Sequence, residues 1–268
     1  MAARAHTRSS GLDSQWYFKQ MRNFEVVETG HVTPNMFRVR FGGADVIAFP
    51  EGFAGGYLKL RIPLEGDAVA VRTYTIRHQD KDGIDVDFAL HGDKEAAGLA
   101  THWALDAQPG MRLDVGGPGQ PKPLPAANGH YIIAGDMTAL PAISVNLEAL
   151  GPDARGDVFL EIQHEDDIQD LAVPKNVRLH WLVNPVPGGN PDLLVDAIRA
   201  LDWPDALTYA WVATEFEAMR NLRAYLRGER ALGPDQLYIS SYWKRGLIED
   251  DHRTVKSADA QAETPARG

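Results

Sequence analysis

Polar and apolar residues alternate along the first half of the chain, between residues 24 and 117. In MFRVRF (36–41) the Phe and Val side chains share one face, and two arginines share the other. The segments YLKLRI (57–62) and IDVDFAL (84–90) repeat this period of two. Such alternation is typical of β-strands with one buried face. Short strands separated by Gly, Pro and Asp turns therefore predict an antiparallel barrel.

The second half of the chain has a different pattern, in which apolar runs alternate with segments of helical spacing. The apolar runs predict strands at residues 130–135, 157–163, 177–183, 208–214 and 236–243. The helical spacing predicts helices at residues 138–150, 191–201 and 215–229. Strands that alternate with helices are typical of a parallel sheet with helices on both faces.

A segment with four prolines and no periodic pattern, PGQPKPLPAANG (118–129), separates the two halves and predicts a linker. Both ends of the chain are polar and rich in small residues, which predicts flexible termini. The predicted parts are a flexible N-terminus, a barrel domain, a linker, an α/β domain and a flexible C-terminal tail, at residues 1–20, 21–120, 121–129, 130–248 and 249–268.

Composition and charge exclude several classes of function. The chain has 37 Asp and Glu against 27 Lys and Arg, a net charge of −10, whereas a nucleic-acid surface needs an excess of positive charge. It has no cysteine, which removes disulfides, thiolate nucleophiles and thiolate metal sites. HxxxH, HExxH and GxSxG spacings are also absent. We expect no nucleic-acid partner, no bound metal and no hydrolase.

Hydropathy along the chain indicates where the protein acts. No apolar run is long enough to span a membrane, and the N-terminal stretch lacks the apolar segment of a secretory signal. We therefore expect a soluble, cytoplasmic protein without membrane insertion, and we expect it to be a monomer.

The hexapeptide RTYTIR (72–77) carries side chains suited to a flat, phosphorylated ligand. Alternation places Arg72 and Tyr74 on one face of the predicted strand, and Thr73 and Thr75 on the other. An arginine holds a phosphate through its planar fork, and a tyrosine ring lies against a flat heterocycle. The hexapeptide alone fits an ordinary half-exposed strand equally well.

Two later segments place small residues at the start of a predicted helix. The first of these helix starts contains Gly98, Ala100 and Thr101. Its backbone N–H groups would suit a pyrophosphate, although a plain helix cap is an alternative. In GDMTALPA, Gly135 permits tight backbone geometry, and Pro141 suits a first helical turn. A GxGxxG fingerprint is absent.

The succession of these motifs resembles the siderophore-interacting protein family, also called ferric-siderophore reductases. Its segments here are RTYT, HG with GLATHWA, GGPG, AGDMTALPAI, YAWVATE and SYWKRG. The resemblance covers residues 20–247, and AGDMTALPAI and SYWKRG are its most specific parts. It implies the architecture of the ferredoxin reductase superfamily. In that architecture, an N-terminal antiparallel six-stranded Greek-key β-barrel binds FAD, and a Rossmann-like parallel α/β domain binds NAD(P)H.

The resemblance also implies roles for individual residues. Arg72, Tyr74 and Thr75 would contact the phosphate, the isoalloxazine face and a ring nitrogen of FAD. The other positions implied to bind FAD or the nicotinamide dinucleotide are Thr73, His91, Gly98, Ala100, Thr101, Gly135, Asp136, Thr138, Ala139, Thr214 and Glu215. The residues implied to act in the reaction itself are Tyr74, Thr75 and Asp136.

Two segments bear on the dinucleotide. Thr214 stands where the family more often has glycine, and a side chain there could narrow the dinucleotide path. Glu215 beside it also fits a favourable charge at a helix start. Glu165, Asp166 and Asp167 follow the strand at 157–163, where superfamily members discriminate between NADPH and NADH. Their charges would repel a 2′-phosphate and favour NADH, unless Arg220 or Arg223 folds back or these acids form a solvated turn.

The substrate side depends on local positive charge. Ferric siderophores are often anionic, so a protein with a net charge of −10 needs a basic funnel to attract them. The resemblance places Lys59, Lys244 and Arg245 at the substrate. Trp243 is a further candidate for contact with the substrate, although an aromatic residue at a strand end also fits ordinary packing. Lys59 alone also fits an ordinary surface charge on a sheet edge.

We therefore predict an FAD-dependent ferric-siderophore reductase. It would pass electrons from NADH or NADPH through the flavin to chelated Fe(III), and release Fe(II) for iron assimilation. Two alternatives stay open. One is a generic flavin oxidoreductase that works with NAD(P)H or ferredoxin, and the other is a non-catalytic siderophore-binding flavoprotein.

Overall fold

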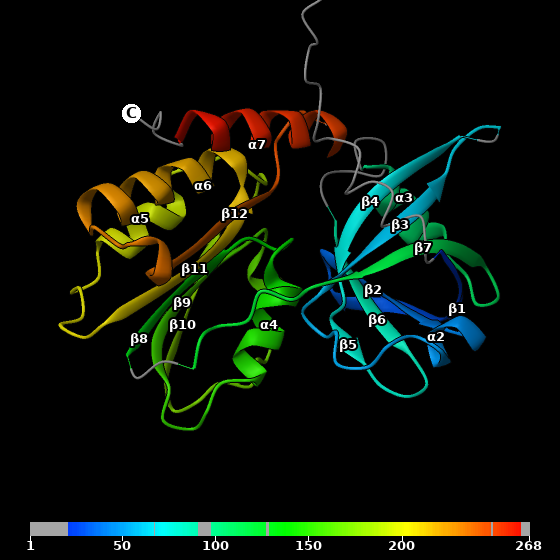
Figure 1. Ribbon diagram of the computed structural model, residues 1–268, viewed down its shortest axis with the longest axis horizontal. Coiled ribbons are helices and arrows are strands. Elements are labelled where there is room, and N and C mark those ends of the chain that lie inside the picture. The colour runs from blue at the N-terminus through cyan, green and yellow to red at the C-terminus, as the bar shows by residue number, and fades with distance from the viewer. Residues whose placement is uncertain (1–20, 67, 91–97, 127–128, 248, 264–268) are drawn as a thin grey trace, which may run out of the picture.

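The computed structural model describes residues 21–66, 68–90, 98–126, 129–247 and 249–263, in which an antiparallel sheet is followed by a parallel one (Figure 1). The first sheet has the strand order β4-β3-β7-β1-β2-β6-β5. Its strands are β1 Arg22–Thr33, β2 Met36–Gly42, β3 Tyr57–Pro63, β4 Val69–Thr75, β5 His78–Gln79, β6 Ile84–Ala89 and β7 Arg112–Gly119. Six of them form the predicted barrel, and β5 adds a strand of two residues.

Alternation along these strands builds the core of the barrel half. Val39 and Phe41 of β2 and Leu58 and Leu60 of β3 are fully buried, because they share the inner face of a curled sheet. The curl brings β4 close to β6, where the rings of Tyr74 and Phe88 lie 4.3 Å apart between centroids. Within the described residues no ladder joins β4 to β5, so the barrel is open there.

The second sheet is parallel, with the order β10-β9-β8-β11-β12. Its strands are β8 His130–Gly135, β9 Arg155–Ile162, β10 Asn176–Val183, β11 Thr208–Glu215 and β12 Leu237–Trp243. From β8 the chain continues to β9 on one side and later to β11 on the other. The order of strands therefore reverses between β8 and β11, which is where ligands bind in open α/β sheets. An antiparallel barrel followed by a Rossmann-like α/β sheet confirms the predicted fold class.

The helices lie on both faces of the parallel sheet, as predicted. Helix α4 (Leu140–Glu148) lies on the face toward the barrel, and α5 (Leu193–Arg199) and α6 (Phe216–Arg223) cover the other face (Figure 1). The π-helical turn Ala224–Glu229 completes the predicted helix at 215–229. Two short helices, α2 (Ala44–Ile47) and α3 (Leu99–Asp106), belong to the barrel half. Among the described residues, no helix has both the length and the apolar character that crossing a membrane requires.

The predicted flexible C-terminal tail is wrong over most of its length. Residues Glu249–Glu263 form helix α7, which lies across the α/β half beside α6 (Figure 1). His252 is buried, and its Nε2 lies 2.9 Å from Ser241 Oγ. Arg223 donates two hydrogen bonds to Asp259, at 2.7 and 2.9 Å. These contacts come from β12 and α6, so a polar sequence that predicts no core of its own is ordered by its neighbours. The predicted flexible N-terminus lies outside the described residues.

Apolar and polar contacts join the two halves. Met36 and Ala89 of the barrel half pack into the core of the α/β half, and the Arg77 guanidinium lies 2.6 Å from Glu148 of α4. Gln163 Nε2 donates a 2.6 Å hydrogen bond to the carbonyl of Leu90. The carboxyl ends of the parallel strands are therefore held against the barrel.

Candidate functional site

Strand β4 forms the barrel side of the site. Arg72, Tyr74 and Thr75 are half-buried and Thr73 is exposed, whereas every residue of the neighbouring inner strand β6 is buried. The Tyr74 ring packs on Phe88, and the residue as a whole is half-buried. The predicted segment therefore presents a partly open aromatic and cationic surface on a rigid sheet.

Lys59 lies beside this strand, on the face of the sheet that carries Thr73. It lies directly opposite Thr73 in the β3–β4 pair, and its ammonium donates a hydrogen bond to the Thr73 hydroxyl. It also lies 5.8 Å from the centre of the Tyr57 ring. Lys59 is thus held against the Thr73 side of the strand that carries Tyr74.

A second lysine approaches Lys59 from the opposite half of the molecule. Lys256 of α7 donates hydrogen bonds to Ser240 Oγ at 2.7 Å and to the carbonyl of Ser241 at 2.8 Å. Burial lowers the pKa of Lys256, and the nearby charge of Lys59 lowers it further. The two ammonium groups therefore share one region at the junction of the halves. The sequence prediction missed Lys256, because nothing in a polar tail indicates which strand it packs on.

The start of α3 is the second element of the barrel side. Gly98 is its exposed N-cap, and no side chain of the described residues caps this helix. Its first turn contains no acidic residue, and Ala100 and Thr101 are buried there. Backbone N–H groups in a first turn have no partner within the helix, so this end suits an anion. His91, which was predicted on the same path, lies outside the described residues.

Asp136 organises the opposite side of the site, at the carboxyl ends of the parallel strands. Its Oδ1 accepts hydrogen bonds from the Thr138 backbone N–H at 2.9 Å and the Thr138 hydroxyl at 2.5 Å. Its Oδ2 accepts from the Thr214 hydroxyl at 3.0 Å and the Trp243 indole N–H at 2.8 Å. Asp136 thus joins the loop after β8 to the ends of β11 and β12. Thr214 therefore has a structural partner, which family patterns do not reveal.

Close packing explains the small residues beside Asp136. A Cβ on Gly135 would lie 2.7 Å from both the Ala213 carbonyl oxygen and Ile143 Cδ1. Ala139 is fully buried at the N-cap of α4, and Pro141 occupies the first turn of that helix. The loop therefore needs glycine because β11 and α4 approach its backbone closely.

Glu215 is the N-cap of α6. Its Oε2 accepts hydrogen bonds from the backbone N–H groups of Glu217 at 2.5 Å and Ala218 at 3.4 Å. Its Oε1 accepts from the backbone N–H of Arg245 at 3.0 Å. The alternative interpretation of Glu215, a favourable charge at a helix start, describes these contacts well.

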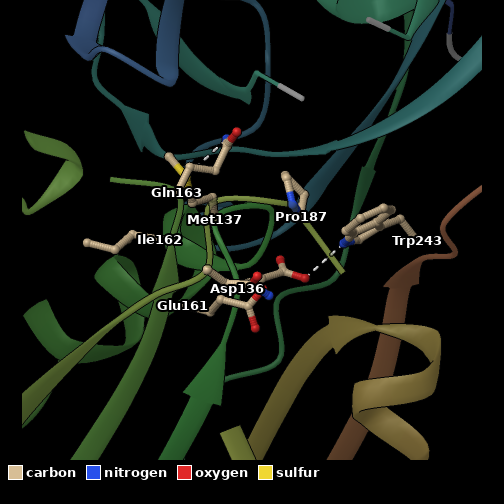
Figure 2. Close-up of a pocket in the computed structure, with 8 residues that line it drawn as sticks. Asp136, Met137, Glu161, Ile162, Gln163, Pro187 and Trp243 are labelled. Carbon is tan, nitrogen blue, oxygen red and sulfur yellow. Dashed lines mark hydrogen bonds between the residues drawn. The ribbon is translucent and has the colours of Figure 1, made fainter. Parts of the chain in front are cut away.

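Glu161, at the end of β9, is a buried carboxyl group that the sequence prediction missed. With Asp136 and Trp243 it lines a cavity of about 10 Å³ at this edge of the sheet (Figure 2). Burial raises the pKa of Glu161 to about 7, and the nearby charge of Asp136 adds to the effect, although Asn184 opposes it. A glutamate on an apolar strand carries no sequence signal for this, because the other carboxylates come from distant segments.

The acidic loop after β9 differs from its predicted role at one position. Asp167 is fully buried and points toward the barrel, where Oδ1 accepts from the Thr33 hydroxyl and the Asn35 N–H, both at 2.9 Å. Its Oδ2 accepts from Asn35 Nδ2 at 2.8 Å. Asp167 is therefore unavailable to a ribose 2′-phosphate. Glu165 and Asp166 stay exposed on the same loop.

The predicted basic pair after β12 is divided. Lys244 Nζ lies 2.5 Å from Glu217 and 4.2 Å from the centre of the Phe216 ring, so its charge is largely engaged on α6. The Arg245 side chain is exposed. Arg220 and Arg223 pair with Asp259 of α7, so they do not fold back over the acidic loop.

Comparisons with known proteins decide the family. The profile described as "Siderophore-interacting protein" matches residues 128–246, and "Siderophore-interacting FAD-binding domain" matches residues 64–122. The ferric vibriobactin reductase ViuB of Vibrio cholerae is 36% identical over 251 residues, which cover 85% of this chain and 91% of ViuB. The chain belongs to the siderophore-interacting protein family. This confirms the resemblance predicted from the motifs.

Solved structures agree with this assignment. The siderophore-interacting protein SipS from Aeromonas hydrophila superposes with a TM-score of 0.80 at 30% identity, over 90% of this chain and 98% of that one. The ferredoxin-NADP+ reductase from Plasmodium falciparum superposes with a TM-score of 0.63 at 11% identity, over 85% of this chain and 98% of that one, which shows the shared fold.

FAD is the cofactor of this siderophore-interacting protein, as the match over residues 64–122 shows. The residues present fit it. β4 offers Arg72 for a phosphate and a partly open Tyr74 ring for a flat heterocycle, and α3 begins without a side-chain cap or an acidic residue. Neither β4 nor the first turn of α3 contains an acidic residue that would oppose a pyrophosphate.

Proposed function

We propose that this member of the siderophore-interacting protein family is an FAD-dependent ferric-siderophore reductase, with a reduced nicotinamide dinucleotide as electron donor. The observation that carries the proposal is that Lys256 of α7 lies near enough to Lys59, the neighbour of Thr73 on β4, for the charge of Lys59 to lower the pKa of Lys256. Two ammonium groups next to the cofactor strand form a local positive site on a protein with a net charge of −10. The identity to ferric vibriobactin reductase supports the same substrate class.

The barrel half would hold the cofactor. Arg72 would bind a phosphate of FAD, Tyr74 would lie against its ring system, and Thr73 and Thr75 would supply hydroxyl groups. Gly98, Ala100 and Thr101 would offer backbone N–H groups at the start of α3. When bound, FAD would supply the chemistry that takes two electrons from the donor and delivers them one at a time, each to one ferric ion.

The α/β half would bind the donor at the carboxyl ends of its strands, where the strand order reverses. Asp136 would act as a positioning residue, because its four hydrogen bonds hold Thr138, Thr214 and Trp243 in place. Gly135 and Ala139 would keep the loop after β8 compact. Glu165 and Asp166 remain exposed and would favour NADH over NADPH by repelling a 2′-phosphate.

The substrate would be drawn to the junction of the halves. Lys59 and Lys256 would bind the anionic oxygens of a ferric chelate, and Trp243 and Arg245 would border the same region. Electron transfer to the metal leaves Fe(II), which hard oxygen ligands hold less tightly than Fe(III). The residues need not break a covalent bond, so their contribution is attraction and orientation.

The test separates substrate binding from cofactor binding. The double variant Lys59→Gln with Lys256→Gln should retain its FAD content and its rate of flavin reduction by NADH. Reoxidation by ferric chelates should slow by about tenfold, since two attractive charges are lost. The matched control is Lys81→Gln with Lys175→Gln, two exposed lysines elsewhere on the surface.

Stopped-flow absorbance of the flavin would follow both half-reactions, with NADH, NADPH and reduced ferredoxin as donors. Unchanged reoxidation by ferric chelates, at low and at high salt, would contradict the proposed substrate site. Fast reoxidation by quinones alone would favour a generic flavin oxidoreductase. A flavin that no donor reduces would favour a siderophore-binding protein without catalysis.

A further inference from the structure

Three buried carboxyl groups meet where the parallel strands end, and they differ in their partners. Asp136 accepts four hydrogen bonds, and Glu215 accepts two from the first turn of α6 and one from Arg245 N–H. Glu161 has weaker support, from Asn184 Nδ2 at 2.8 Å and the backbone of Gly188. Asp136 and Glu215 therefore have the hydrogen bonds that stabilise an ionised carboxylate, whereas Glu161 has fewer of them.

No cation faces Glu161 in the described part of the chain. Its ionisable neighbours are Asp136, from the loop after β8, and Glu215, from the end of β11, and both are acids. The segment after β12 contributes the backbone N–H of Arg245, whose side chain is exposed. A buried carboxylate beside like charges is costly, so this group takes up a proton when negative charge nearby increases.

Glu161 also lies where the donor would bind. Figure 2 shows it beside Asp136, in the cavity that Met137, Pro187 and Trp243 help to enclose. The cavity of about 10 Å³ is close to the smallest space that holds one water molecule. Little solvent therefore screens Glu161 from an anionic ligand that binds over this cavity, in the crevice outside the carboxyl ends of the strands.

We propose that Glu161 couples donor binding to a proton, so that the protein takes up a proton on Glu161 when an anionic nicotinamide dinucleotide occupies the crevice. This inference rests on the proposed function, because it assumes that the donor binds at these strand ends. It follows that rising pH weakens donor binding, since an ionised Glu161 adds a third negative charge. Coupling is reciprocal, so the bound dinucleotide must also favour the protonated form.

The test is calorimetric and does not depend on turnover. FAD-loaded protein is titrated at pH 7 with 1,4,5,6-tetrahydro-NAD, which has the charge of NADH and transfers no hydride. The titration is repeated in buffers of different ionisation enthalpy, which gives the number of protons taken up. The wild type should take up a fraction of a proton, and its affinity should fall about fivefold from pH 6 to pH 8.5.

The variant Glu161→Gln keeps the shape of the side chain and its hydrogen bond to Asn184, but cannot ionise. It should bind the analogue with no linked proton and with an affinity that does not change with pH. Asp153→Asn and Asp170→Asn change exposed acids on the loops before and after β9, and both should keep the proton uptake of the wild type.

The outcomes separate this inference from the proposed function. Binding without proton uptake by the wild type would overturn the role of Glu161 and leave the donor site intact, and this result needs no variant to fold. Proton uptake that persists in Glu161→Gln would also overturn it. Failure of the analogue and of NADH to bind at any pH would instead remove the nicotinamide donor itself.

Discussion

The two edges of the parallel sheet both carry buried carboxylates, and among the described residues the one at the amino edge is held by an arginine and two histidines. Asp157 of β9 lies 2.8 Å from His130 of β8, His180 of β10 and Arg178 of β10. Burial alone would raise the pKa of Asp157, but hydrogen bonds from these three residues lower it below its ordinary value. At the carboxyl edge of the same strand, Glu161 has no such partner among the residues that the structure describes, and its pKa is raised to about 7.

This difference separates a structural carboxylate from a responsive one. Residues 157 and 161 belong to one strand and are both almost inaccessible to solvent. At the amino edge, Asp157 is hydrogen-bonded to basic side chains. At the carboxyl edge, Glu161 lies beside other carboxylates next to the crevice. Uncompensated buried charge reduces stability, and such groups cluster at functional sites. The following predictions are ordered from the largest expected effect to the smallest.

Asp167 also lies near the carboxyl edge. Its carboxylate accepts hydrogen bonds from neutral donors of the barrel half. Replacing it with alanine would leave the buried Thr33 hydroxyl, two part-buried N–H donors of Asn35 and the backbone N–H of His164 without this acceptor. We expect Asp167→Ala to lower the free energy of unfolding by about 3–4 kcal/mol. Guanidinium denaturation at pH 7 would measure this. The exposed neighbour variant Asp166→Ala should change it by less than about 0.5 kcal/mol, and an equal effect of both would contradict the interpretation.

A substitution at Asp157 tests how much its contacts at the amino edge contribute to stability. Asp157→Ala removes the acceptor that His130, Arg178 and His180 share, but Arg178 is largely exposed and can be hydrated instead. We expect a loss of about 2–3 kcal/mol in the free energy of unfolding at pH 7. Asp153→Ala, an exposed acid in the loop before β9, serves as the control. A loss below about 1 kcal/mol would show that the amino edge does not depend on these pairs.

We expect the contribution of Glu161 to stability to fall as the pH rises. Its pKa in the folded protein, about 7, is above its ordinary value, so its contribution to stability is present at low pH. That contribution is lost as the pH rises through about 7. Between pH 5 and pH 9, Glu161→Gln should therefore gain about 2 kcal/mol of stability relative to the wild type. Urea denaturation across this range would measure the change. Parallel curves for the two proteins would show that Glu161 does not titrate differently on folding.

Thr214 tests the smallest effect, a single hydrogen bond to Asp136. Thr214→Ala removes the 3.0 Å bond from its buried hydroxyl and should lower the free energy of unfolding by about 1 kcal/mol. Thr214→Ser retains the hydroxyl and should lose less. Equal losses in thermal or chemical denaturation would mean that the methyl group, and not the hydrogen bond, accounts for the contribution of Thr214.

Local patterns predicted much of the fold correctly. The period of two placed β2, β3, β4 and β6, and the change to alternating strands and helices placed the parallel sheet. These features depend on which neighbours along the chain share a face. Helix α7 has no strong apolar face, so its order comes from Ser241 and Arg223, which lie far from it in sequence.

The amino-acid sequence by itself determined the two-part architecture, the family and the segments that form the site. Those properties are encoded in short-range periodicity and in motifs that stand in a fixed order. Only the tertiary structure decided what each charge does. It directed Asp167 into the junction of the halves, brought Lys256 near Lys59 and placed Glu161 beside Asp136 and Glu215. Electrostatic environment depends on burial and on partners from distant segments, and neither is written in the local pattern.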